Sequence, residues 1–539
     1  MTDLRRPDPP PTGRHPAAPH AAAPHAAAPP EVNRTLVLAV MCLALVMVVA
    51  GVSMLANALP SIAADLDASQ SSQQWIIDAY ALTLAALLLP AGALGDRFGR
   101  RGALLAGSAL FGVAAALSAT VGSANELIAL RAVMGIGAAL LMPGTLSTIT
   151  SVFPPEERAK AVGIWAGFAG AGGTLGILAS GALLEQFAWN SIFVVTAVLA
   201  ALVCLGVIFV VPSTRAEERV VLDPRGAVVS ALGIDLLVLG IIEGPERGWT
   251  DPVTLIGLIF GVLFLTAFVL VELRTEHPLL DPRLFKHRGF ASGSVSLFLQ
   301  FFAMFGFFFV SLQFLQLVLG YSTLEAALAL LPMSLLILPI SAVAGTLSER
   351  YGHKLVGGAG LAVSAIGFAL FSTLGTDSGF WPFVLTTLVI GAGAALAMTP
   401  ATNAIVASLP RAKQGVASAV NDTARELGAA FGVAVLGSAF NTGYRHSLDG
   451  HLSGLPADVA RQAREAPAIA VQLGSKIPGG DALVDAARTA FTSGMRYAVL
   501  VGAGLLAIGA VFVWFRGASR TEEVLEDELD VREPAPAVS

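Results

Sequence analysis

The sequence contains few charged residues and very few cysteines. Only 13% of its 539 residues are charged, whereas 55% are hydrophobic. Both cysteines, Cys42 and Cys204, fall inside apolar runs, which excludes a disulfide framework and a thiolate metal site. The net charge is slightly negative and no basic patch alternates with aromatic residues, so nucleic acid is excluded as a partner.

The groups that an enzyme needs are also missing. The apolar runs hold no Ser-His-Asp or metal-ligand grouping and no histidine, and the chain has no Walker-type glycine-rich loop for ATP. We therefore expect no catalytic site, no resident metal and no cofactor. A transport-inactive membrane receptor stays open as a function of another class, although a receptor normally carries a soluble signalling domain as well.

The chain consists instead of a series of apolar runs, many of them near the roughly twenty residues that a helix needs to cross a bilayer. The runs are too continuous for the strands of an outer-membrane barrel, which alternate polar and apolar residues. We expect an all-α polytopic membrane protein with fourteen spans. The expected spans start near Leu36, Trp75, Ala103, Leu127, Ala161, Ile192, Ala227, Val253, Ser294, Leu324, Leu355, Phe383, Val416 and Ala498.

Lysine and arginine are distributed unevenly between the runs. With the N-terminus inside, the short outer loops hold only Arg247, whereas the inner loops are rich in both residue types. The positive-inside rule then predicts a multi-pass protein of the cytoplasmic (inner) membrane with both termini in the cytoplasm. The long segment 441–495 is expected to be external, because long segments cross the membrane regardless of their charge.

Parts of the first half of the chain recur in the second half. The stretch GALGDRFGRR, residues 92–101, recurs more loosely as GTLSERYGHK from residue 345. Such repeats predict a duplicated six-helix bundle, here with two helices inserted between the copies. The predicted units are a disordered cytoplasmic tail (1–33), an N-terminal bundle (34–212), the inserted pair with an inner loop (213–288), a C-terminal bundle (289–516) and an acidic cytoplasmic tail (517–539).

The stretch 92–101 also resembles a family motif. The chain is similar to the major facilitator superfamily, and within it to the fourteen-span drug:proton antiporters, over nearly all of residues 35–516. In that family the motif acts as a latch that stabilises one transport state; the alternative is a topology anchor only. We expect Gly92 to permit close helix approach, Asp96 to pair with cations of the facing helix, and the arginines to lie among the headgroups. The matching residues are Gly92, Gly95, Asp96, Arg97, Gly99, Arg100 and Arg101.

Arg131, followed by Gly135 and Gly137, resembles the motif that the superfamily associates with proton transfer. An arginine within a span costs roughly 2.5–3.5 kcal/mol on insertion scales, so it needs a partner or water. Asp78 lies at a similar depth of a neighbouring span and is the expected partner. The pair either takes up a proton from outside or forms a permanent structural salt bridge.

Three further acidic residues within spans are candidates for proton coupling. Asp422, Arg425 and Glu426 lie on roughly one face of a helix, where Asp422 and Arg425 can neutralise each other and leave Glu426 unbalanced. Asp235 lies near the middle of an inserted span, where proton coupling and a structural role both stay open.

Two positions depart from the family pattern. Gly51 and Ser53 precede Ala-Leu-Pro where the family usually has Asp-x-Thr, and Ile177 replaces the proline of the antiporter motif Gly-Pro-x-x-Gly-Gly. These departures leave a weakly coupled facilitator, or an exporter of lipid-like substrates, as alternatives.

The run from Ser294 is crowded with phenylalanines and also carries glutamines. By the duplication it corresponds to the first span, which lines the substrate cavity in the superfamily. A wall of rings and amides suits bulky amphipathic or aromatic compounds such as drugs, antibiotics and dyes. We therefore predict a monomeric, proton-driven exporter of such compounds that works by alternating access. The expected cavity residues are Ser53, Asn57, Trp165, Phe298, Gln300, Phe301, Phe305, Phe308 and Gln313.

Overall fold

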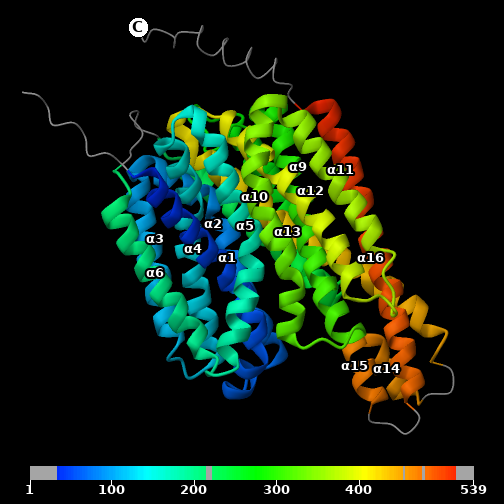
Figure 1. Cartoon of the computed structure of the whole chain (residues 1–539). Coiled ribbons are helices and arrows are strands. Elements are labelled where there is room, and N and C mark those ends of the chain that lie inside the picture. The colour runs from blue at the N-terminus through cyan, green and yellow to red at the C-terminus, as the bar shows by residue number, and fades with distance from the viewer. Residues whose placement is uncertain (1–32, 214–220, 453–455, 476–479, 518–539) are drawn as a thin grey trace, which may run out of the picture.

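A computed structural model of the chain describes residues 33–213, 221–452, 456–475 and 480–517. Every regular element in these ranges is helical, and the long helices lie side by side in one bundle (Figure 1). This arrangement confirms the expected all-α polytopic fold. The predicted disordered tail and the predicted acidic tail lie outside the described residues, apart from Asn33 and Gly517.

The helices follow one another with short connections. The first group is α1 (Arg34–Asp65), α2 (Gln70–Phe98), α3 (Arg100–Ser118), α4 (Ala124–Val152), α5 (Pro155–Leu184) and α6 (Asn190–Val210). The next helices are α7 (Pro224–Arg247), α8 (Pro252–Glu272) and the short η1 (Pro282–Lys286). The last group is α9 (Arg288–Gln313), η2 (Phe314–Val318), α10 (Thr323–Tyr351), α11 (His353–Phe371), α12 (Phe380–Ala407), η3 (Arg411–Lys413), α13 (Gln414–Asp449), α14 (Ala457–Glu465), α15 (Pro467–Gly474) and α16 (Asp481–Arg516).

Local sequence explains where many of these helices begin and end. The side chains of Ser69, Ser123 and Ser322 accept hydrogen bonds from backbone N–H groups of the first turns of α2, α4 and α10. Gly99 separates α2 from α3 with a φ of 106°, and Gly352 separates α10 from α11 with a φ of 83°. Only glycine adopts this conformation without strain, so both copies of the repeated stretch keep a glycine at the turn.

Thirteen helices in the described ranges are long and apolar enough to cross a membrane. α13 is not among them, because Asp422, Arg425 and Glu426 interrupt its apolar sequence, although it is 36 residues long. The expected spans from Leu36 to Val416 each correspond to a helix that begins at or a few residues before the expected start.

α13 and α16 both extend into the segment 441–495, which stays predicted to be external. α13 continues to Asp449, and α16 begins at Asp481, well before Ala498. The connection between these two helices is therefore shorter than the predicted segment 441–495. Within that connection the stretch PADVARQAREAPAIAVQL forms two short helices, α14 and α15, with a break between them. Ala466 is extended at the break, because the ring of Pro467 disfavours a helical conformation for the residue before it.

The buried side chains form two hydrophobic clusters. One cluster lies almost wholly within α1–α6, and the other joins α9–α16 to α7 and to one side of α2. The two groups of helices meet at an α2–α13 seam and at an α5–α10 seam, and α7 packs against both α2 and α13. We call the end of the bundle where α1 begins the Arg34 face and the opposite end, near α14 and α15, the Asp65 face (Figure 1).

Candidate functional site

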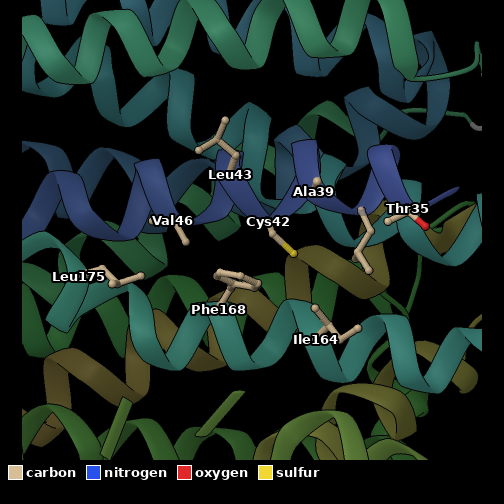
Figure 2. A pocket seen from close by; sticks show the side chains of 9 residues that line it. Thr35, Ala39, Cys42, Leu43, Val46, Ile164, Phe168 and Leu175 are labelled. Atoms are coloured by element: carbon tan, nitrogen blue, oxygen red, sulfur yellow. The ribbon is translucent and has the colours of Figure 1, made fainter. Parts of the chain in front are cut away.

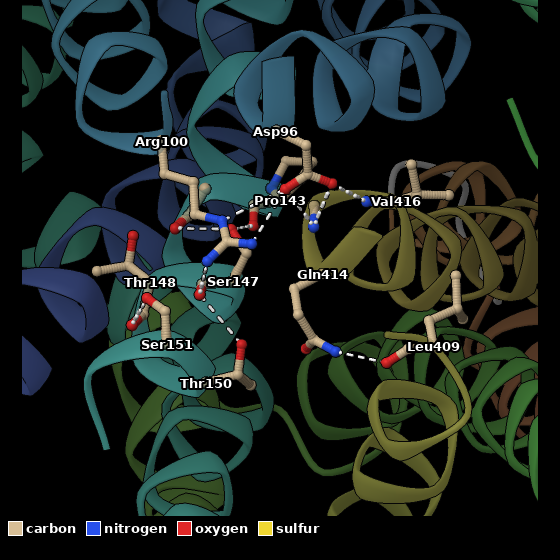
Figure 3. A network of polar contacts seen from close by, with 12 residues as sticks. Asp96, Arg100, Pro143, Ser147, Thr148, Thr150, Ser151, Leu409, Gln414 and Val416 are labelled. Carbon is tan, nitrogen blue, oxygen red and sulfur yellow. Dashed lines mark hydrogen bonds and ion pairs between the residues drawn. The ribbon is translucent and has the colours of Figure 1, made fainter. Parts of the chain in front are cut away.

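Asp96 joins the two groups of helices at the Arg34 face. Its buried carboxylate accepts hydrogen bonds from the backbone N–H of Gly415, with distances of 2.9 and 2.8 Å to its two oxygens, and from the N–H of Val416 at 3.2 Å (Figure 3). These N–H groups belong to the first turn of α13, so a negative charge stands at the positive end of a helix. The contact closes the α2–α13 seam at this face.

Arg100 completes this contact. Its Nε and Nη2 donate to Oδ1 of Asp96 at 3.3 and 3.2 Å, and its Nη1 donates to the carbonyl oxygen of Ser147 at 3.3 Å. Asp96 thus pairs with a cation as expected, but this cation is Arg100 at the start of α3, and α13 contributes backbone amides instead. The expectation that Arg100 lies among the headgroups is wrong, because this side chain is buried. The start of a helix offers free N–H groups, so a carboxylate there needs no cation from the facing helix.

The other arginines of the motif stay near the surface of the Arg34 face. The guanidinium of Arg97 lies 5.5 Å from the ring centre of Phe98, and Nη2 of Arg101 donates to the carbonyl oxygen of Ile208 at 2.6 Å. Gly95 accepts the backbone hydrogen bond of Gly99 that closes α2.

Glycines hold the helices together at both seams. A Cβ on Gly92 would lie 2.5 Å from the carbonyl oxygen of Gly415, so the expected close approach is present. At the α5–α10 seam, a Cβ on Gly163 would collide with the carbonyl oxygen of Ser341, and one on Gly345 with that of Ala159. Backbones in such contact bring the two groups of helices together at the Arg34 face.

Arg131 is fully buried in α4, yet it has no ion pair with Asp78. Its Nε donates to the carbonyl oxygen of Ile76 at 2.9 Å, its Nη1 donates to that of Gly51 at 3.2 Å, and the guanidinium lies 4.3 Å from the ring centre of Tyr80. Two backbone carbonyls and a ring thus replace the expected carboxylate, while Nη2 is buried without a partner. Asp78 is half-buried on α2 and has contacts of its own.

The acidic residues of α13 lie as expected. Nη1 of Arg425 donates to Oδ1 of Asp422 at 3.2 Å, and both side chains are buried, so the expected mutual neutralisation is present. Glu426 is half-buried and has no ion pair among the described residues. Asp235, on α7, is also half-buried and has no ion pair in the same part of the chain.

Arg425 also touches aromatic rings from both groups of helices. Its guanidinium carbon lies 4.7 Å from the ring centre of Phe301 on α9 and 5.5 Å from that of Trp165 on α5. The indole of Trp165 is fixed, because its Nε1 donates to Oγ1 of Thr145 at 3.0 Å. Arg425 thus connects the two groups within the bundle, about three turns of α13 away from the contact with Asp96.

The expected cavity residues of α1 are turned towards α5. Nδ2 of Asn57 donates to Oγ of Ser180 at 2.8 Å and to the carbonyl oxygen of Ile177 at 3.3 Å. Oγ of Ser53 stands where a Cβ on Gly176 would be. Both side chains hold α1 against α5, and their role towards a substrate stays a prediction.

The phenylalanines of α9 are divided between different surroundings. Phe301 and Phe305 stack with centroids 6.1 Å apart, and Phe305 meets Phe308 edge-on. Phe298 packs on Phe431 of α13, and Phe309 is exposed. The expected glutamines bond within the protein: Oε1 of Gln300 accepts from Ser364 at 3.1 Å, and Nε2 of Gln313 donates to a carbonyl of its own helix.

A hollow of about 470 Å³ lies between α1 and α5 (Figure 2). None of the expected cavity residues lines it. Its walls are almost wholly apolar. In the sequence these residues therefore resemble those of any helix surface that faces lipid, and no sequence pattern marks them as the lining of a hollow. The residues that line it are Thr35, Leu38, Ala39, Cys42, Leu43, Val46, Ile164, Phe168 and Leu175.

His353 was also missed. It is buried as the first residue of α11, so the expectation of no histidine in the spanning helices is wrong. It occupies the position of Arg100 in the second copy of the repeated stretch, where the two sequences differ. In the part of the chain that the structure describes, no three His, Cys, Asp or Glu side chains are grouped so that they could hold a metal ion.

Known proteins resemble this chain over most of its length. The family profile of the Major Facilitator Superfamily matches residues 41–433. The multidrug efflux pump LfrA of Mycolicibacterium smegmatis is 35% identical over 88% of this chain and 95% of its own length. The methyl viologen resistance protein SmvA of Salmonella typhimurium is 34% identical over 89% and 97%, and the tetracenomycin C resistance and export protein of Streptomyces glaucescens is 30% identical over 89% and 91%.

Solved structures show the same fold. The superfamily's proton:xylose symporter XylE, bound to a bromodeoxyglucose, superimposes with a TM-score of 0.58 over 92% of this chain and 98% of its own. Its sequence is only 18% identical, so the likeness concerns the arrangement of the helices and not the substrate.

Proposed function

The chain belongs to the major facilitator superfamily, and from this premise we propose that it is a secondary transporter that uses inward proton flow to export bulky hydrophobic or amphipathic compounds. Relatives that are named for multidrug efflux, for methyl viologen resistance and for tetracenomycin C export support drugs, antibiotics and dyes as the substrate class. The transporter works by alternating access, as a monomer.

The proposal includes the arrangement in the membrane. The Arg34 face is cytoplasmic with both termini, which the distribution of lysine and arginine supports. The bundles are residues 34–212 and 289–516, and α7 and α8 are the inserted pair. α13 also crosses the membrane, which brings the number of spans to fourteen. The hydrophobic cluster that lies almost wholly within α1–α6 supports the first of these bundles.

One observation carries the proposed mechanism: Asp422, Arg425 and Glu426 lie on α13, where Arg425 touches Trp165 of the other group of helices. A carboxylate at such a place is sensitive to the bundles' movement, because the movement changes its access to water. A proton that crosses the membrane inward releases about 2.3 kcal/mol per 100 mV of membrane potential, which can drive export. Asp78, Arg131 and Asp235 are further members of the proposed proton route.

The latch gives the proposed cycle its two states. With Asp96 bound to α13 and glycines in contact at both seams, the Arg34 face is closed, so the substrate leaves towards the Asp65 face. Release of the contact between Asp96 and α13 opens the cytoplasmic side. The motif thus acts as a latch. Gly92 contributes by allowing α2 to approach α13 closely, and Arg100 contributes through its ion pair with Asp96.

The test is the efflux of a lipophilic dye from cells that produce the full chain, with and without a protonophore. Asp422→Asn and Glu426→Gln keep the size of each side chain but cannot carry a proton as an acid. Each is expected to slow uncoupler-sensitive export by at least about tenfold, the scale of a lost coupling step. Asp377→Asn, in an exposed loop between α11 and α12, is the matched control and should leave export unchanged.

The outcomes separate the function from its site. Unchanged, uncoupler-sensitive export in both variants rejects these two carboxylates as proton carriers. Export by the unmodified chain that ignores the protonophore identifies a facilitator, which the departures at Gly51 and Ile177 would then explain. Lack of export for a broad panel of lipophilic compounds rejects the transporter.

A further inference from the structure

Arg425 occupies a position between two rings of different origin. Phe301 comes from α9, in the last group of helices, and Trp165 comes from α5, in the first group. The guanidinium carbon lies 4.7 Å from the ring centre of Phe301 and 5.5 Å from that of Trp165. A cation over a ring face is attracted by the negative charge of that face, and the attraction is strongest for tryptophan. The side chain of Arg425 therefore fills an aromatic site that both groups of helices build.

This aromatic site lies near the middle of the bundle. Trp165, Phe301 and Arg425 follow the starts of α5, α9 and α13 by ten to thirteen residues. At a rise of 1.5 Å per residue this puts them about 15–20 Å from the ends of these helices at the Arg34 face, or roughly half the thickness of a bilayer core. A ligand held between two transporter bundles is bound at that depth.

The rings are fixed more firmly than the cation between them. Trp165 is only 1% exposed and its Nε1 is bonded to Thr145. Arg425 has one hydrogen bond, from Nη1 to Asp422, while its Nε and Oδ2 of Asp422 are buried without partners. The pair is therefore held by a single hydrogen bond, and it leaves one carboxylate oxygen and one guanidinium N–H without partners. A guanidinium on a flexible stem can leave this position, whereas the rings stay.

We propose that Trp165 and Phe301 form a binding position for an aromatic organic cation and that Arg425 is its tethered occupant, which such a ligand displaces. Asp422 supplies the counter-charge through its unpartnered oxygen. The inference deepens the proposed function, on which it rests, by naming a specificity-determining residue. A neutral compound of the same size lacks the electrostatic attraction that the ring faces exert on a cation, so it competes poorly with Arg425.

The experiment measures binding and needs no transport. Ethidium, a planar aromatic cation, and N-phenyl-1-naphthylamine, a neutral aromatic compound, are titrated by fluorescence against the purified full chain in detergent. Arg425→Gln removes the competing cation and keeps a donor for Asp422. It is expected to lower the Kd of ethidium about fivefold to tenfold and to leave that of the neutral probe within about twofold, in the range of one desolvated cation–π contact.

Three further variants isolate the rings from the charge. Trp165→Leu in the Arg425→Gln background should cancel the gain in affinity for ethidium. This variant loses the ring face but keeps the negative charge of Asp422. Arg425→Lys keeps a tethered cation and should bind ethidium within about threefold of the unmodified chain. Arg350→Gln is the matched control, since the Arg350 guanidinium lies 5.3 Å from the ring centre of Tyr351, away from this site.

The proposal is overturned if Arg425→Gln weakens ethidium binding or leaves it unchanged in protein that runs as a single species on gel filtration. It is also overturned if the gain survives Trp165→Leu, because unpaired Asp422 alone would then attract the cation. Should Arg425→Gln fail to fold, the affinity of Trp165→Leu for ethidium decides, with a loss of about fivefold expected. Uncoupler-insensitive efflux would refute the proposed function and leave these binding results standing.

Discussion

Asp96 makes a charged contact between α2 and the start of α13 at the Arg34 face. It is 2% exposed, and all of its contacts are charge-assisted: two backbone amides at the start of α13 and the guanidinium of Arg100. Hydrogen bonds to a charged group contribute about 1.5–3 kcal/mol each, so removal of this one charge weakens the whole latch.

We expect Asp96→Asn to lower the free energy of unfolding by about 1–3 kcal/mol and to slow dye export, because a neutral amide stabilises neither Arg100 nor the start of α13. Denaturant titration in mixed micelles and efflux from cells measure the two effects. The matched control is Glu349→Gln, at the equivalent place in the second repeat, where the side chain is exposed. Equal losses in the two variants would show that burial and the contact with α13 do not matter.

Arg131 shows how far a residue's surroundings follow from its sequence. Its cost in the membrane correctly predicts that it is buried with polar partners. Depth along two helices does not predict how each helix is rotated, and the guanidinium turns towards the carbonyl oxygens of Gly51 and Ile76. For Arg425 the sequence predicted the partner, because Asp422 lies one turn away on the same helix.

At the level of elements, apolar length predicted most helices and failed at the ends of α13 and α16. α16 begins with a turn that carries Asp481 and Asp485 and continues through Arg488 and Arg496, so a search for apolar runs finds only its later part. The helix extends beyond the apolar run because its early part packs on α13 and α15. Such packing between helices leaves no mark in the local composition.

Tyr444 fastens this projecting region. Its hydroxyl donates to the carbonyl oxygen of Ala463 at 2.8 Å, and the side chain is 1% exposed, so it ties α14 to the extended end of α13. We expect Tyr444→Phe to cost about 1 kcal/mol locally and to speed amide exchange in α14 about fivefold. Hydrogen exchange read by mass spectrometry tests this, with Tyr497→Phe, an exposed tyrosine of α16, as control. Unaltered exchange in α14 would mean that other contacts hold it.

At the level of the whole molecule, alternating access requires the α5–α10 seam to change. A Cβ on Gly167 would lie 3.3 Å from that of Ser341, close to the spacing of about 3.5–4.5 Å in a disulfide. In a chain without Cys42 and Cys204, oxidation of the Gly167→Cys, Ser341→Cys pair is expected to stop export, and a reductant is expected to restore it. Export rates before and after oxidation measure the effect.

A second cross-link controls for cysteine chemistry. Gly112 and Ala200 face each other between α3 and α6, within the first group of helices, where a Cβ on the glycine would lie 2.9 Å from that of the alanine. Cysteines at these two positions should leave export unaffected by oxidation, because rigid-body rocking does not separate α3 from α6. Continued export with the α5–α10 seam joined would contradict the movement of two rigid bundles.

In the proposed arrangement, the hairpin of α7 and α8 restricts how that movement can take place. α7 rests on α2 and on α13 at once, and those two helices come from opposite bundles. When α2 and α13 separate, α7 cannot stay in contact with both helices. It must therefore move together with one bundle and slide along the other. The hairpin then moves during every transport cycle, and the helix that it separates from loses its contact with α7.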